Sequence, residues 1–174
     1  MSGRHAYNVA LVALFSSVIL VEKILAPAPY DKFFSILIES FLLCIGFIVL
    51  GFMGPISIGF ISGILLAFVR GGLAPFTILL AAIYGLLISF FSKLLKVRVN
   101  STVREVRLAA SAGIASAITG TLGTLIVLML GVALIPSIII ASLFIVGLAQ
   151  GIVGGYLAAA LWNRFLRKIG LRFR

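Results

Sequence analysis

The amino-acid sequence consists mainly of long apolar runs, separated by short breaks that contain proline, glycine or charged residues. Charged residues make up only 10% of the chain and hydrophobic residues 63%, whereas a soluble domain usually carries about 25% charge. So few charges cannot cover a surface that faces water, which excludes a soluble globular fold, and the apolar content excludes a disordered chain. We therefore predict an integral membrane protein whose main solvent is lipid.

The lengths of the apolar runs predict six transmembrane helices in one domain that covers residues 1–174. A spanning helix needs about 20 apolar residues, so six of them use most of the chain. Proline residues lie in or beside the breaks, where they end one helix or open the next. The expected spans are approximately 6–26, 33–52, 55–69, 75–95, 103–133 and 136–165. The predicted fold class is therefore an all-α, six-helix membrane bundle.

Two of these boundaries depend on local arguments. Residues 33–69 could form one bent helix, but a helix of that length would measure about 55 Å, too long for a single span. Thr102 and Glu105 have the spacing of a capping box, in which the two side chains satisfy the first backbone groups of a helix. This pattern predicts that the fifth helix begins near Val103.

Lysine and arginine residues are distributed unevenly between the two sides of the predicted bundle. The first residues, the connection between the fourth and fifth spans, and the tail share one side, because even numbers of spans separate them. This side holds 11 of the 14 basic residues and the other side 3. The positive-inside rule therefore predicts a multi-pass protein of the cell membrane with both termini in the cytoplasm. Membrane flanks also account for the net charge of +10, so we expect no nucleic-acid partner.

Small residues recur about four positions apart, which lets helices approach closely in lipid. In the later helices they predict contacts inside the bundle, and the residues concerned are Gly59, Gly63, Gly120, Gly147, Gly151 and Gly155. In the first helix, Ala6, Ala10 and Ala13 form a similar stripe beside the short N-terminus. That stripe is equally compatible with internal packing and with docking on another membrane protein.

Several polar residues gather on the predicted outer side, and they are Tyr30, Asp31, Glu39, Arg70, Tyr84 and Gln150. An unpaired ionisable group in the bilayer costs at least ~2.5 kcal/mol, so we expect Glu39 to face water, the bundle interior or a cation such as Arg70 or Lys32. One interpretation is an outward-facing pocket for a small polar or amphipathic molecule. The other is a structural ion pair, or snorkelling to the interface.

The sequence contains few side chains that could take part in catalysis, disulfide formation or metal binding. His5 and Cys44 are the only residues of their kinds and lie in separate segments, so we expect no disulfide, metal site or nucleophile–base pair. The nucleotide-binding pattern G-x-x-x-x-G-K-[ST] does not occur. We therefore predict neither an enzyme nor a bound cofactor, and the lack of a charged ring or filter-like repeat argues against a channel.

The layout resembles the S component, the substrate-binding membrane subunit of energy-coupling factor (ECF) vitamin transporters. The segments that carry this resemblance are AYNVA at 6–10, GPISIGFISG at 54–63, RGG at 70–72 and GIVGGY at 151–156, followed by a basic tail. The resemblance implies capture of a vitamin-like molecule from outside, in a pocket formed by the segments 27–32, 70–74 and 131–136 with the last three helices. It makes Tyr30, Asp31, Glu39, Arg70, Tyr84 and Gln150 candidate substrate-binding residues.

The same resemblance implies partner proteins. Ala6, Ala10 and Ala13 would dock on a transmembrane coupling protein, which two cytosolic ATPase subunits drive. The alternative from the residues alone is a non-catalytic structural or assembly subunit of a larger membrane complex, since small-residue stripes and sparse intramembrane polar groups suit both functions.

Overall fold

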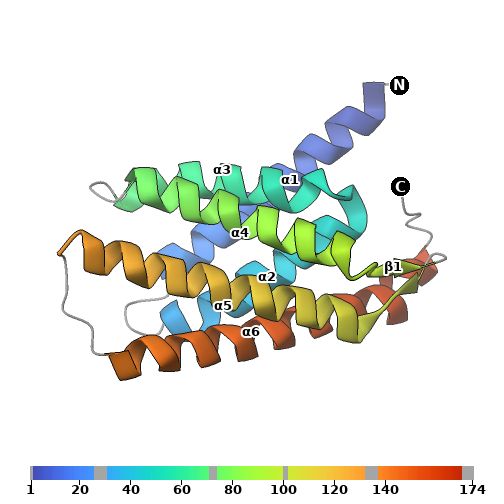
Figure 1. The fold of residues 1–174 in the computed structure, drawn as a ribbon. Helices are drawn as coiled ribbons and strands as arrows, with labels where there is room; N and C mark the ends of the chain where they lie inside the picture. The colour runs from blue at the N-terminus through green and yellow to red at the C-terminus, as the bar shows by residue number, and fades with distance from the viewer. Residues whose placement is uncertain (1, 26–30, 71–73, 100–101, 132–136, 170–174) are drawn as a thin grey trace.

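A computed structural model describes residues 2–25, 31–70, 74–99, 102–131 and 137–169. Within these ranges the fold is helical apart from one short antiparallel hairpin (Figure 1). The elements are α1 (Ser2–Leu25), α2 (Asp31–Leu50), α3 (Met53–Arg70), α4 (Ala74–Leu94), β1 (Arg98–Val99), β2 (Thr102–Val103), α5 (Glu105–Met129), α6 (Ser137–Arg164) and the 3₁₀ turn η2 (Leu166–Ile169).

Four helices are long and apolar enough to cross a membrane, and the sequence expectation of an all-α membrane-type bundle is confirmed at this level. They are His5–Leu25 of α1, α4, α5 and Ile140–Arg164 of α6. The other two apolar helices are shorter over their described parts, Ser35–Leu50 and Met53–Val69. All six helix positions agree with the expected spans to within a few residues, because each follows an uninterrupted apolar run.

The helices alternate in direction, so their ends gather at two ends of the bundle (Figure 1). The start of α1 and the end of α6 lie at the same end as the β1–β2 hairpin; we call this the hairpin end. The ends of α1, α3 and α5 and the starts of α2, α4 and α6 lie at the other end; we call this the distal end. The two ends of the bundle are therefore formed by different sets of helix starts and helix ends.

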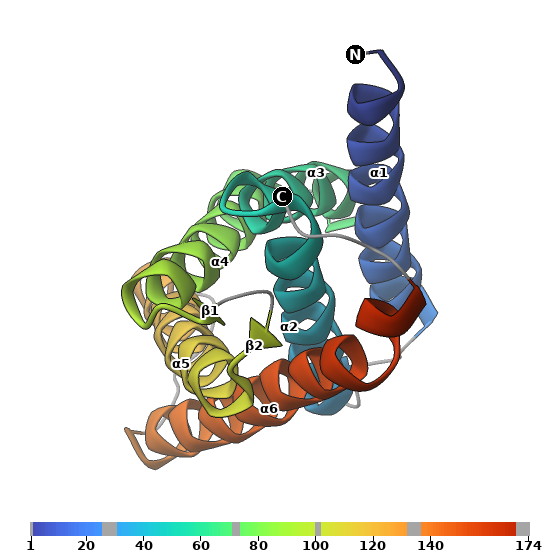
Figure 2. The ribbon, with the colours of Figure 1, turned by 90° about the vertical axis from the view of Figure 1, so that its right-hand side faces the viewer.

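Helix α2 lies inside a ring formed by the other helices (Figure 2). Its residues 42–48 are all buried, and this stretch is accordingly apolar on every side of the helix. The most extensive helix contacts join α5 with α6, α3 with α4, and α2 with α6. Helix α1 packs against α3, and Ser16 Oγ donates a hydrogen bond of 3.2 Å to the Ile58 carbonyl.

Glycines allow the closest helix approaches. A Cβ at Gly63 would lie 2.9 Å from Ile78 Cα in α4, and a Cβ at Gly155 would lie 2.8 Å from the Ala112 side chain in α5. Gly59 and Gly151 are similarly tight, whereas the nearest atom to a Cβ at Gly147 would be 3.4 Å away. In lipid, such contacts replace the hydrophobic effect as the force that holds helices together.

The start of α5 differs from the expected capping box. Thr102 lies in β2 and pairs with Val99, so it cannot cap the helix. Arg104 is the N-cap and makes no side-chain capping bond. Glu105 accepts a hydrogen bond from Asn163 Nδ2 at 3.2 Å, and the same amide group bonds both backbone groups of Val103. The capping prediction was wrong because tertiary contacts with α6 satisfy this segment instead.

Arg98 of β1 contacts the carbonyl groups at the end of α2. Its guanidinium donates hydrogen bonds to the carbonyls of Phe47 and Ile48 and lies 5.2 Å from the centroid of the Phe47 ring. The last carbonyls of a helix have no partner within it and carry partial negative charge, so a cation here is favourable. Burial lowers the pKa of Arg98 below its ordinary value.

Candidate functional site

A partly open cavity of about 190 Å³ lies among α1, α2, α3, α4 and α5. Its wall uses the last turn of α1, the first half of α2 and α4, the last half of α3 and the middle of α5, so most of it belongs to the distal half of the bundle. The polar residues that line it are Lys23, Glu39, Thr77, Tyr84, Ser116 and Thr119, and the remaining ones are Ile36, Leu66, Leu80, Ala81 and Gly120. The cavity thus combines an apolar wall with one ion pair and several hydroxyl groups.

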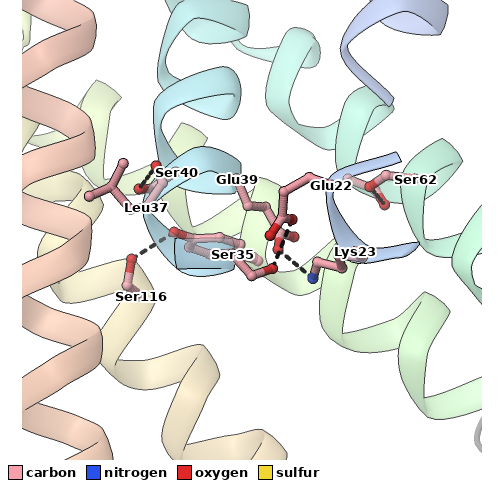
Figure 3. Close-up of polar contacts among 10 residues, drawn as sticks. Glu22, Lys23, Ser35, Leu37, Glu39, Ser40, Ser62 and Ser116 are labelled. Atoms are coloured by element: carbon pink, nitrogen blue, oxygen red, sulfur yellow. Dashed lines mark hydrogen bonds and ion pairs between the residues drawn. The ribbon is translucent and has the colours of Figure 1, made fainter. Parts of the chain in front are cut away.

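The ion pair joins α1 to α2 across the cavity wall (Figure 3). Lys23 Nζ lies 2.7 Å from Glu39 Oε2, and the two side chains are 16% and 9% exposed. Glu22 Oε2 accepts a hydrogen bond of 3.1 Å from Ser35 Oγ beside this pair. The α1 end and the α2 start run antiparallel, so the four side chains converge from two helices.

A pair of hydroxyl groups lies between α4 and α5. Tyr84 Oη and Ser116 Oγ are 2.6 Å apart, and Ser116 Oγ donates to the Ala112 carbonyl at 2.8 Å. A serine hydroxyl has a single hydrogen, so Tyr84 donates to Ser116. One turn further along α5, Thr119 Oγ1 is buried and has no hydrogen-bond partner among the residues that the structure describes. A ligand group in the cavity would satisfy it.

The structure brings together two of the residues singled out from the sequence. Glu39 and Tyr84 both line the cavity, whereas Gln150 of α6 does not. Tyr30 lies outside the described residues, as do the side chains of Asp31 and Arg70. The expected cation partners of Glu39 were Arg70 or Lys32, but Lys23 occupies that position, because α1 crosses α2 next to Glu39.

Four cavity residues were missed by the sequence reasoning: Lys23, Thr77, Ser116 and Thr119. Lys23 is one of the three basic residues counted on the outer side, and Ser116 is a small residue four positions before Gly120. The spacing from Thr77 to Tyr84 and from Ser116 to Thr119 keeps each pair on one helix face, which is a signal that could have located them.

Gly120 also differs from its expected role in helix packing. A Cβ built at Gly120 has no heavy atom within 4 Å, and the residue lines the cavity. Ala6, Ala10 and Ala13 are all exposed. The N-terminal part of α1 extends past the ring of the other helices (Figure 2), so this face remains uncovered within the described chain.

The described residues contain no group of three or more His, Cys, Asp or Glu side chains that could hold a metal ion. Comparison with protein-family models, with curated proteins and with solved structures finds no match to this chain. The fold and the site therefore define the class directly: an all-α, membrane-type helix bundle with a small, partly polar internal cavity.

Proposed function

We propose that this chain is the membrane-embedded substrate-capture subunit of an ECF-type importer. It binds a vitamin-like small molecule from the outer face and docks on a transmembrane coupling protein driven by two cytosolic ATPase subunits. The observation that carries this proposal is the distal cavity, in which Glu39, Lys23 and Tyr84 present polar groups inside an otherwise apolar bundle. Such a concave site with a few convergent polar groups is typical of ligand binding.

The topology that the proposal requires has six spans. Helix α2 has 20 residues and α3 has 18, which correspond to about 30 Å and 27 Å of helix. These lengths are close to the thickness of the hydrocarbon core, which supports the assignment of α2 and α3 as the two further spans. A six-span chain has both termini on one side, and the common position of the start of α1 and the end of α6 at the hairpin end supports this topology.

Charge supports the orientation of the cavity. The hairpin end carries Lys93, Lys96, Arg104 and Arg164. Among the described side chains of the distal half, Lys23 is the one cation. Cytoplasmic flanks are enriched in Lys and Arg, so the hairpin end faces the cytoplasm and the cavity faces outward. An outward-facing cavity is what a capture subunit needs.

The exposed stripe on α1 is the proposed docking face. Ala6, Ala10 and Ala13 are small enough for another transmembrane helix to approach the α1 backbone closely. Val106 is also exposed, at 77%, and lies near the start of α5, at the same end of the bundle but on a different helix. Val106 therefore provides a matched control for Ala10.

The first test uses the protein purified in mild detergent from the membranes of its own host. We expect native mass spectrometry to find a retained small molecule, and affinity purification to recover ATPase subunits with the chain. Ala10→Trp should abolish the recovery of these subunits, while Val106→Trp should preserve it.

The outcome that contradicts the proposal is equally specific. A constitutive partner in fixed stoichiometry, without ATPase subunits and without any bound small molecule, identifies a structural or assembly subunit instead. Recovery of ATPase subunits with Ala10→Trp at the level of the unchanged protein would contradict the docking face alone.

A further inference from the structure

We propose that the captured substrate is a small organic cation, a protonated amine on an apolar body, whose ammonium group replaces that of Lys23 at Glu39. This inference rests on the proposed function and names the substrate class of the same cavity. The two partners of the ion pair differ in how readily each can move away from the cavity.

Glu39 cannot leave the bundle interior. It lies about two turns into α2, its side chain is 9% exposed, and its stem is short. A carboxylate without a partner at such a position is costly, so Glu39 requires a positive group beside it in every state of the cavity.

Lys23 can leave. It lies in the last turn of α1, two residues before the helix ends at Leu25, and its side chain is more exposed, at 16%. A lysine near a helix end can extend its four-carbon stem and place its ammonium in the interfacial water. Exchange of this cation for a ligand cation therefore preserves the pairing of Glu39 and leaves Lys23 solvated.

An anionic ligand, in contrast, would remove the partner of Glu39. It would pair with Lys23 and leave the Glu39 carboxylate without its partner. The carboxylate of Glu22, which accepts a hydrogen bond from Ser35, lies beside this pair (Figure 3). Like charges at close range in a poorly solvated site repel strongly. The cavity thus disfavours anions more than cations.

The rest of the cavity sets the size and the remaining chemistry of the substrate. A volume of about 190 Å³ is somewhat larger than a cavity of ~150 Å³ that holds benzene, so the ligand has roughly eight to ten non-hydrogen atoms. Leu66, Leu80 and Ala81 form an apolar wall, and the buried Thr119 hydroxyl offers one hydrogen bond. A single ring that carries an ammonium group fits this description.

The test compares three probes of nearly the same size that differ in charge: benzylammonium, benzyl alcohol and benzoate. Binding to the purified protein in nanodiscs is measured by isothermal titration calorimetry at neutral pH. We expect benzylammonium to bind at least about tenfold more tightly than benzyl alcohol, and benzoate to bind weakest. Glu39→Gln should remove the preference for the cation.

A second variant separates this inference from a general loss of structure. Lys23→Met removes the internal competitor for Glu39, so benzylammonium should bind more tightly than to the unchanged protein, by about tenfold. Lys93→Met, at the exposed hairpin end, is the matched control and should leave all three affinities unchanged. A gain of affinity cannot arise from misfolding.

Three results would overturn the inference: tighter binding of benzoate than of benzylammonium, weaker binding of benzylammonium to Lys23→Met, or an equal Glu39-dependent signal from sodium ions alone. Each of these leaves ligand capture itself intact. Failure of every probe to bind, with a retained small molecule still seen by native mass spectrometry, also overturns only the substrate class. Failure of the probes without any retained molecule overturns the proposed function as well.

Discussion

Gly151 tests whether the contact between α5 and α6 positions the hydroxyl pair of the cavity. A Cβ at Gly151 would lie 2.6 Å from the Ala112 carbonyl and 2.8 Å from Gly113 Cα, and it would collide with Ser116 Oγ. Gly151→Ala must therefore push α6 away from the α5 backbone and displace the group to which Tyr84 donates its hydrogen bond.

The magnitude follows from three contributions. Overpacking costs about 1–3 kcal/mol, and loss of the hydrogen bond between Tyr84 and Ser116 costs about 1 kcal/mol. The higher helix propensity of alanine offsets about 1 kcal/mol of this. We expect Gly151→Ala to lower the free energy of unfolding by about 1–3 kcal/mol. Gly147→Ala, one turn earlier on α6, meets its nearest atom only at 3.4 Å and should be neutral or stabilising by up to about 1 kcal/mol.

Reversible unfolding in mixed micelles, followed by circular dichroism, measures both variants. Repeating Gly151→Ala in a Ser116→Ala background removes the collision with the hydroxyl but keeps the backbone collision. The cost of Gly151→Ala should therefore fall by about 1 kcal/mol without vanishing. Equal unfolding free energies for Gly151→Ala and Gly147→Ala would refute the reasoning.

Three further predictions concern the cavity and the hairpin end. Gly120→Leu places a side chain where a Cβ meets open space, so it should abolish retention of a small molecule in native mass spectrometry without lowering stability. Arg98→Ala removes two hydrogen bonds to carbonyls at the end of α2 and should destabilise the fold by about 1–3 kcal/mol in the same unfolding assay, and Arg98→Lys should have an intermediate effect. Asn163→Ala should speed hydrogen exchange of the Val103 amide by about tenfold, and unchanged exchange would contradict the anchoring of the hairpin by α6.

Much of the helix layout could be predicted because it depends on local properties of the chain. The span expected at 75–95 is α4, Ala74–Leu94, and the one expected at 136–165 is α6, Ser137–Arg164. An apolar run of this length in lipid must satisfy its backbone groups within itself, and an α-helix does so. The β1–β2 hairpin was missed because its stability comes from α2 and α6, through Arg98 and Asn163.

The candidate site was predictable only in part. The cost of a buried charge marked Glu39 from the sequence, but the identity of its partner depended on where α1 crosses α2. Gln150 was marked by the same polarity and does not line the cavity. Ser116 gave no signal of its own, since a small residue in a stripe is compatible with packing as well as with a site.

By itself, the sequence determined that this chain is a helical membrane-type protein, where its helices lie, and that Glu39 must face water, the bundle interior or a positive partner. Only the tertiary structure decided that Lys23 is that partner, that Gly120 lines a cavity and that Gly151 lies at a close contact between α5 and α6. The physical reason is that helix formation in lipid depends on neighbouring residues, whereas side-chain contacts depend on the rotation of each helix about its axis. One residue corresponds to about 100° of that rotation, so a side chain meets a different neighbour with each step along the helix.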